Sequence, residues 1–272
     1  MQPILTYPPQ SKFRAAIESG RWLGRALVLA GFGAACFELG GCMPTQSPAQ
    51  PETIEMFDGK TLAGWKGDPT YWSVRDGALV GEVTPATLLQ HNSFIIWQGD
   101  MPADFELTVA YRISKLGNSG INYRSEQVEG SPYALRGYQA DLDGRNKHTG
   151  STYEERRRTI IAAQGESVQL PELRDPEALE EYTKGNKYKA RKVLGKLGTR
   201  AQLHAHIKAD DWNEYRIVAR GNHLRHFVNG VLMSEVVDDD PVHRRFDGLL
   251  GVQVHVGPPM KVEYRNFRLS AL

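Results

Sequence analysis

The sequence has few cysteines, almost no excess of charge and no hydrophobic run of membrane-spanning length. Its two cysteines cannot form the disulfide framework on which many small secreted domains depend. The 33 lysines and arginines nearly balance the 32 aspartates and glutamates, leaving a net charge of +1. Because no basic surplus is present to neutralise phosphates, we expect no nucleic-acid partner. The apolar run 26–37 is shorter than the roughly 20 residues that a membrane-spanning helix needs.

Several common catalytic signatures are also missing. The sequence contains no P-loop, no G-x-G-x-x-G motif and no G-x-S-x-G motif. Both cysteines, Cys36 and Cys42, lie in the N-terminal segment, so the remaining chain has no thiol that could act as a nucleophile.

The first 42 residues have the composition of a lipoprotein export signal. Basic side chains precede the apolar run 26–37, which is the order found in signal peptides. The run is followed by Leu39-Gly40-Gly41-Cys42, which resembles a bacterial lipobox. We therefore predict lipidation of Cys42, with Cys36 as a weaker second candidate; an uncleaved anchor or a misassigned start is the alternative. The basic residues are Lys12, Arg14, Arg21 and Arg25.

The rest of the chain divides into a tether and one domain. Residues 43–53 are rich in proline, glutamine, serine and threonine, which predicts a flexible tether between lipid and domain. Residues 54–272 are expected to form the folded domain. The protein is then an exported lipoprotein, anchored in a membrane and facing the periplasm or the cell surface.

The pattern of the domain is that of antiparallel strands. Residues 105–113 alternate apolar and polar side chains, which is typical of a strand with one buried face. Asp76-Gly77 and Asn229-Gly230 suit two-residue hairpin turns, because such turns need positive φ. Many short strands broken by turns predict an all-β fold, a two-sheet jelly-roll sandwich.

Residues 159–210 interrupt this pattern and are predicted to be an insertion that contains a helix. Asp175-Pro176-Glu177 is a typical helix start, and the helix is expected to end near Lys184. Residues 184–200 are basic, and we interpret them as a solvated surface loop, with a patch for anionic ligands as the minor alternative.

Three strand segments place polar side chains on one face, with glycines between them. Because neighbours on a strand point to opposite faces, the apolar residues of the same segments take the core side. Amide, carboxylate, guanidinium and imidazole groups bind sugars and metals well, so we predict a functional concave face rather than a merely hydrated one. These polar residues are Asn118, Asn122, Arg124, Gln139, Asp141, Asp143, Gln253 and His255.

A series of short motifs resembles the bacterial 3-keto-disaccharide hydrolase domain family over about residues 54–272. The series opens with Phe57-Asp58-Gly59-Lys60 and Leu62-x-Gly64-Trp65. The motifs that follow in order are Trp72-x-Val74-x-Asp76-Gly77, Asp104-Phe105-Glu106-Leu107, Gly117-Asn118-Ser119-Gly120-Ile121, Gly137-Tyr138-Gln139, Thr149-Gly150-x-x-Tyr153-Glu154-Glu155, Asp211-Trp212-Asn213-Glu214-Tyr215, Val228-Asn229-Gly230 and Tyr264-Arg265-Asn266-Phe267.

The resemblance implies a concanavalin-like jelly roll, export, and action on glycosides that are oxidised at C3. It also implies a divalent metal ion in at least some members. The sequence departs from the family pattern at Gln139, where many members have glutamate, and in its long insertion.

The ketone chemistry implied by the resemblance assigns roles to the polar face. A ketone at C3 makes the C2 proton acidic, so a base can remove it and the C1 group leaves by elimination before water adds. We expect Asp141 and His255 to be base and metal ligand, in either order, and Glu155 to be the acid. Substrate-binding roles are expected for Asn118, Asn122, Arg124, Gln139, Tyr153 and Gln253.

Two other functions use the same face. An ordinary jelly-roll glycoside hydrolase would use the strand Gln139-x-Asp141-x-Asp143, but Gln139 is an amide and cannot be the nucleophile. A non-catalytic carbohydrate-binding lipoprotein could stack sugars on Trp97 or Tyr138. Glu154 and Glu155 could instead form salt bridges with the arginines at 156–158.

The lipobox leads to a direct prediction about localisation. Changing Cys42→Ala removes the thiol that would carry the lipid, so the variant should leave the membrane fraction on fractionation. A variant that stays in the membrane fraction with an intact N-terminus would contradict lipidation and favour an uncleaved anchor.

Overall fold

The computed structural model describes residues 53–175 and 178–272. The export segment, Cys42 and tether residues 43–52 lie outside the described residues, so lipidation stays a prediction. Among the residues described, no helix has the length and apolar character needed to cross a membrane.

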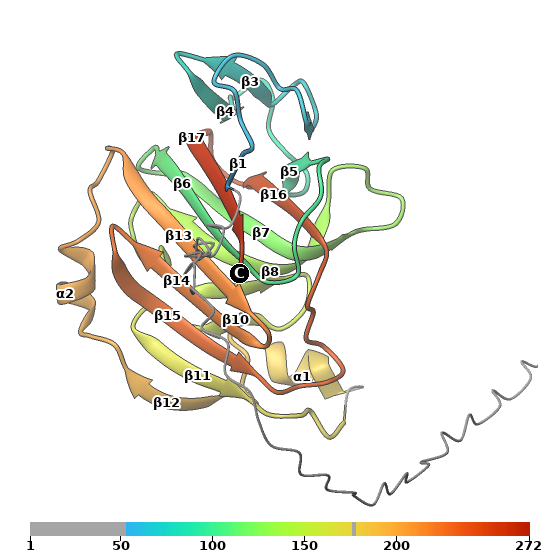
Figure 1. The fold of residues 1–272 in the computed structure, drawn as a ribbon, viewed down its shortest axis with the longest axis vertical. Helices are drawn as coiled ribbons and strands as arrows, with labels where there is room; N and C mark the ends of the chain where they lie inside the picture. The colour runs from blue at the N-terminus through green and yellow to red at the C-terminus, as the bar shows by residue number, and fades with distance from the viewer. Residues whose placement is uncertain (1–52, 176–177) are drawn as a thin grey trace, which may run out of the picture. The chain divides into compact units, whose positions relative to one another are not determined.

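The described strands form two sheets, as predicted for an all-β sandwich (Figure 1). Sheet A has the order β12-β11-β15-β14-β13-β6-β17-β4-β3, with β1 also paired to β17, and sheet B has the order β10-β9-β8-β7-β16-β5-β2. The strands of sheet A are β1 (Thr53–Glu55), β3 (Trp72–Arg75), β4 (Ala78–Val83), β6 (Phe105–Ile113), β11 (Glu166–Leu170), β12 (Lys192–Lys196), β13 (Asn213–Arg220), β14 (His223–Val228), β15 (Val231–Asp238) and β17 (Met260–Ala271). Those of sheet B are β2 (Trp65–Lys66), β5 (Ser93–Trp97), β7 (Asn118–Gln127), β8 (Leu135–Asp143), β9 (Thr152–Glu155), β10 (Thr159–Ala162) and β16 (Leu249–Val254).

The core lies between the two sheets and follows the period-2 pattern of the sequence. Along β6 every second side chain is buried, which confirms the alternation predicted for residues 105–113. From sheet B, Tyr138, Ala140 and Leu142 point into the same core. The predicted hairpin turn at Asn229-Gly230 has positive φ at both residues, 48° and 81°, as its tight geometry requires.

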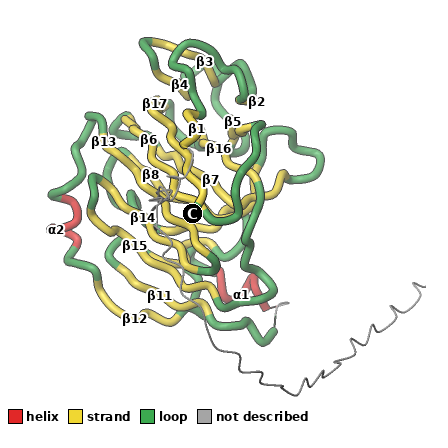
Figure 2. Tube along the Cα trace, viewed as in Figure 1, coloured by secondary structure: helices red, strands yellow, loops and turns green. Residues whose placement is uncertain are grey.

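The segment 159–210 is part of both sheets rather than an appendage. It supplies β10 to sheet B, β11 and β12 to sheet A, and two short helices, α1 (Leu179–Thr183) and α2 (Arg200–His204), drawn in red in Figure 2. The predicted helix is therefore shorter than expected, and Pro176 and Glu177 are not described.

The interpretation of residues 184–200 as a surface loop is wrong for two parts of that stretch. Lys192–Lys196 form the edge strand β12, whose lysines suit a sheet edge because charge discourages further strand pairing. Tyr188 is fully buried. The cations of Arg191 and Lys196 bind the carboxylate of Glu166, so part of the basic charge is neutralised within the fold.

A buried network of charges connects the two sheets. The guanidinium of Arg158 is fully buried and pairs with Glu154 of β9 and, at 2.6 Å, with Asp238 of β15. The hydroxyl of Tyr138, on β8, donates to the same carboxylate of Asp238 at 2.5 Å. Asp240 lies 3.6 Å from the guanidinium. The cation therefore holds carboxylates from both sheets in a place that water does not reach.

Removal of Arg158 should test this network. Arg158→Leu leaves buried carboxylates without a counter-charge, so we expect the free energy of unfolding to fall by about 3–5 kcal/mol. Arg75→Leu is the matched control, because Arg75 and Glu82 form an arginine–glutamate pair whose side chains are 49% and 37% exposed. The control should lose no more than about 1 kcal/mol in denaturant titrations. Equal losses of unfolding free energy in both variants would show that the buried ion pair stabilises the fold no more than an exposed one.

Candidate active site

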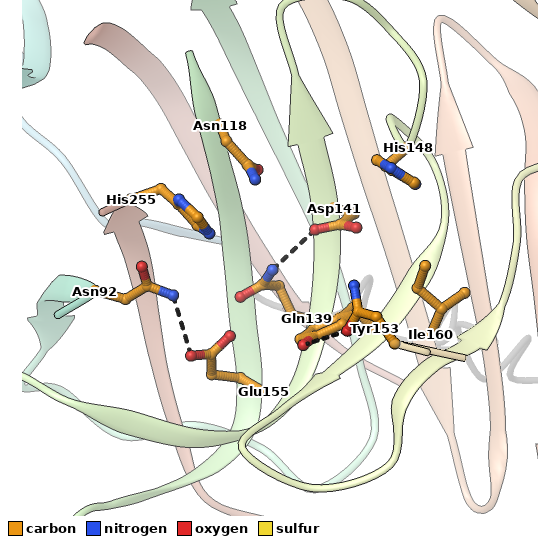
Figure 3. A pocket seen from close by; sticks show the side chains of 10 residues that line it. Asn92, Asn118, Gln139, Asp141, His148, Tyr153, Glu155, Ile160 and His255 are labelled. Atoms are coloured by element: carbon orange, nitrogen blue, oxygen red, sulfur yellow. Dashed lines mark hydrogen bonds between the residues drawn. The ribbon is translucent and has the colours of Figure 1, made fainter. Parts of the chain in front are cut away.

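A polar pocket of about 310 Å³ lies on the face of sheet B that points away from the core. Strand alternation places it there: Gln139 and Asp141 of β8 line the pocket, while Tyr138 and Ala140 between and beside them are in the core. Figure 3 shows Gln139 and Asp141 between His255 and Asn92 on one side and His148 and Ile160 on the other. The lining residues are Asn92, Asn118, Gln139, Asp141, His148, Tyr153, Glu155, Ile160, Asn186 and His255.

The structure brings most of the predicted site residues together. All three predicted catalytic residues, Asp141, Glu155 and His255, line the pocket. Of the predicted substrate-binding residues, Asn118, Gln139 and Tyr153 line it too.

Arg124 is placed elsewhere, which corrects the expectation that it faces the ligand. Its guanidinium is buried and donates to the backbone oxygens of Ala103 and Gly221, each at 2.7 Å. The register of β7 shifts between Tyr123 and Glu126, and Arg124 has a φ of 44°. Because a bulge interrupts the alternation, a face assigned from the sequence no longer holds at Arg124.

Asn122 and Tyr138 also do not reach the pocket. Asn122 is fully buried, and its amide nitrogen lies 3.3 Å from the hydroxyl of Ser125. Tyr138 is in the core and bonded to Asp238, so it is not free to stack on a sugar. Trp97, the other predicted stacking residue, packs against Trp65 with ring centroids 5.5 Å apart and is not among the lining residues.

Two side-chain amides, linked by a hydrogen bond, orient the carboxyl group of Asp141. Gln253, fully buried, donates from Nε2 to Oε1 of Gln139 at 3.2 Å. Gln139 in turn donates from Nε2 to Oδ1 of Asp141 at 2.9 Å. Gly120 makes room for this arrangement, since a Cβ there would lie 2.3 Å from Cδ of Gln139. Gln253 therefore positions Gln139 rather than contacting the pocket itself.

Burial makes Asp141 an unusually weak acid. The pKa of Asp141 is raised to about 8: loss of water around the carboxyl group is the largest cause, the hydrogen bond from Gln139 lowers the pKa, and the carboxylates of Asp143 and Glu155 add smaller increases. Asp141 is thus neutral at pH 7, with one oxygen bonded to Gln139 and the other available to a ligand.

Glu155 and His255 are shifted in the directions that also favour their neutral forms. Burial raises the pKa of Glu155, against smaller opposing effects of Asn92, Arg156 and Gln253. Burial lowers the pKa of His255. The Nδ1 atom of His255 lies 2.5 Å from the backbone oxygen of Val256, and because a carbonyl only accepts, Nδ1 carries the proton. The other ring nitrogen, Nε2, is then the basic one.

Four lining residues were not predicted from the sequence: Asn92, His148, Ile160 and Asn186. Asn92 connects Glu155 to the residue after His255, since its amide donates to Glu155 at 3.2 Å and its oxygen accepts from the backbone N–H of Val256. These hydrogen bonds connect residues that are far apart in the sequence, so no local sequence pattern could predict them.

Asp143 explains the position of His148. Its carboxylate accepts the backbone N–H groups of Arg145, Lys147, His148 and Thr149, which closes the loop after β8. Asp143 was expected on the polar face with Asp141, but its oxygens are bound to the backbone. An aspartate followed by glycine is a signal for such a loop, although it does not show where the loop leads.

The comparisons with known proteins agree with the motifs. Residues 52–270 match the sequence model of the 3-keto-alpha-glucoside-1,2-lyase-like domain. The chain belongs to this family. A curated 3-keto-disaccharide hydrolase of Bacteroides thetaiotaomicron is 33% identical over 85 residues, which is 28% of this chain and 28% of that protein. The aligned part therefore spans little more than a quarter of the relative.

Solved structures with a similar fold have low sequence identity. A protein of Parabacteroides distasonis is 17% identical, covers 81% of this chain and 100% of its own, and has a TM-score of 0.48. The β-glucanase of Bacillus licheniformis is 11% identical, covers 83% of this chain and 100% of its own, and has a TM-score of 0.45.

The pocket of this family member does not offer a set of three metal-binding side chains. Within residues 53–175 and 178–272, no three His, Cys, Asp or Glu side chains come together as a metal site needs. Asp141 and His255 would have to be completed by amides or water, and burial favours the protonated form of Asp141. A metal at these two residues stays a prediction of the resemblance.

Gly120 gives a test of the pocket that needs no substrate. Gly120→Ala should push Gln139 away from Asp141 and remove the hydrogen bond that lowers the pKa of Asp141. The pKa should then rise by roughly one pH unit, measured by NMR titration of the carboxyl carbon. Gly195→Ala is the control, since a Cβ there meets no atom within 4 Å. An unchanged titration in the folded Gly120 variant would contradict the packing described.

Proposed function

We propose that this chain cleaves 3-keto-glycosides by elimination across C1 and C2, followed by addition of water. One observation carries the proposal: the pocket combines one basic group that is neutral, His255, with two carboxylic acids, Asp141 and Glu155, whose pKa values are raised. Elimination next to a ketone needs a neutral base and acids that keep their protons, and burial shifts the three groups in these directions.

His255 is the base in this proposal. Its Nδ1 proton is held by the oxygen of Val256, which leaves the lone pair of Nε2 free to take the proton from C2 of the sugar. Because the pKa of His255 is lowered by burial, the ring is in the basic form at neutral pH.

Asp141 acts as a hydrogen-bond donor to the C3 oxygen, and Glu155 acts as the general acid. The neutral carboxyl group of Asp141 donates a hydrogen bond to the C3 oxygen as negative charge develops there, in the manner of an oxyanion hole. Gln139 holds the other oxygen of Asp141, so the donor is oriented before the substrate arrives. Glu155, oriented by Asn92, gives its proton to the oxygen that leaves C1.

The steps balance as follows. The C2–H bond breaks, its proton goes to His255, and the electron pair forms the enolate of the C3 ketone. The enolate collapses to a C1=C2 double bond as the C1–O bond breaks and the leaving oxygen takes the proton of Glu155. Ionised Glu155 then deprotonates a water that adds to C1, and His255 returns its proton to C2.

The same features argue against an ordinary retaining glycosidase. That mechanism needs an ionised carboxylate as nucleophile, whereas burial favours the neutral form of both Asp141 and Glu155. The volume of about 310 Å³ is at the lower end of ligand pockets, which suits one oxidised sugar ring better than a long chain.

Two variants and a pH profile test the roles. His255→Gln should lower kcat/KM on a 3-keto-glycoside by on the order of 10²–10⁴-fold, because the base is lost. Asp141→Asn should keep more activity, because the amide still donates to the C3 oxygen and accepts from Gln139. In the wild type, kcat/KM should fall at acid pH as His255 is protonated. It should fall again near about pH 8 as Asp141 ionises.

Each contrary result has a clear meaning. Loss of all activity in Asp141→Asn with retention in His255→Gln would make Asp141 the base. Affinity for sugars without turnover of any 3-keto-glycoside would make the protein a binding module, and turnover of unoxidised glycosides would make it an ordinary glycosidase. Loss of activity with a chelator, restored by a divalent ion, would support the metal predicted at Asp141 and His255.

A further inference from the structure

Asn186 enters the pocket from a tight turn of the segment 159–210. The turn follows α1 and has positive φ at both Gly185 and Asn186, 83° and 57°. Among the described residues, Asn186 is the only one between β11 and β12 that lines the pocket. Asn186 is exposed, so it stands at the rim, where the pocket opens to solvent.

The turn is held firmly in place on both sides of Asn186. The backbone N–H of Asn186 donates to the oxygen of Thr183 at 3.1 Å, and that of Tyr188 donates to Ile160 of β10 at 3.0 Å. The ring of Tyr188 is fully buried, 6.0 Å from the guanidinium of Arg158. The position of Asn186 is therefore set by the core and not by the loop alone.

Tyr153 fixes which atoms of Asn186 are free. The hydroxyl of Tyr153 donates to Oδ1 of Asn186 at 3.1 Å, which uses the acceptor side of the amide. Among the residues described, Nδ2 of Asn186 has no hydrogen-bond partner, so its donors are available to a ligand. Ile160, paired in register with Tyr153, adds an apolar surface beside them.

The position of Tyr153 relative to Glu155 indicates which part of a substrate would lie there. The two residues are two apart on β9, so their side chains share a face and lie roughly 7 Å apart along the strand. A group attached to an oxygen that Glu155 protonates is therefore within reach of Tyr153 and of Asn186, to which Tyr153 is bonded.

We propose that Asn186, oriented by Tyr153, forms the subsite for the leaving group and selects one that carries hydroxyl oxygens, such as a second sugar or a polyol. The proposal rests on the function proposed above for Glu155. The Nδ2 donors bind a hydroxyl oxygen of the leaving group, and Ile160 contacts its C–H face. A leaving group without oxygen at this place gains nothing from Asn186.

Two substrates with the same oxidised sugar separate this role from a general one. One carries a sugar as leaving group, and the other carries only a methyl group. Asn186→Ala should lower kcat/KM for the 3-keto-disaccharide by about 3- to 10-fold, the effect of one hydrogen bond, and leave the methyl 3-keto-glycoside unchanged. Lys184→Gln is the control, since Lys184 is exposed and pairs with Glu181 away from the lining residues, so this change should not affect either substrate.

Tyr153 provides an independent check within the same experiment. Tyr153→Phe removes the hydroxyl that orients Asn186, so it should lower kcat/KM for the 3-keto-disaccharide more than kcat/KM for the methyl 3-keto-glycoside. The double variant should lose little more than either single variant, because the two residues act as one unit. Competition by the free leaving-group sugar should weaken in the Asn186 variant as well.

The possible failures are distinguishable. Equal losses on both substrates, or no loss on either, would overturn the role of Asn186 and leave the elimination intact. Absence of turnover in the wild type on both substrates would overturn the proposed function. Direct binding of the free sugar, compared between wild type and Asn186→Ala, would then still decide whether Asn186 binds it.

Discussion

The buried cation of Arg158 is the constraint on which the pocket depends. It pairs with Glu154 of sheet B and Asp238 of sheet A, and all three side chains are inaccessible to water. Because neighbours on a strand alternate, holding Glu154 in the interior turns Tyr153 and Glu155 outward into the pocket. The same guanidinium lies against the ring of Tyr188, two residues after Asn186. One ionic centre thus supports two sides of the site.

The chemistry of the pocket comes from the removal of water more than from strong charges. Its base and both acids are each shifted toward the neutral form, and burial is the largest cause in every case. Amides from Gln139, Gln253 and Asn92 then fix the orientation of these groups without adding charge. A site of this kind can hold a neutral sugar and still stabilise charge that develops during a reaction.

The segment 159–210 shows how a departure from the family pattern can be built into a sandwich. Its strands extend both sheets and Tyr188 joins the core, while Ile160 of β10 and Asn186 of the turn after α1 line the pocket. The polar residues Gln139, Asp141, Tyr153 and Glu155 of the pocket lie on β8 and β9, and His255 directly follows β16, whereas Asn186 at the rim comes from the segment 159–210.

The alternation of the strands, the hairpin turn at Asn229-Gly230 and the polar face with Gln139, Asp141 and His255 could be predicted from the sequence. These follow from local rules, because side-chain direction in a strand and positive φ in a turn depend only on near neighbours. Only the tertiary structure decided that Arg124 leaves the face at a bulge, that Asn92 joins Glu155 to the strand of His255, and that Asn186 reaches the rim. It also decided the protonation of Asp141, since desolvation depends on everything packed around a group, and residues far apart in the chain contribute to it.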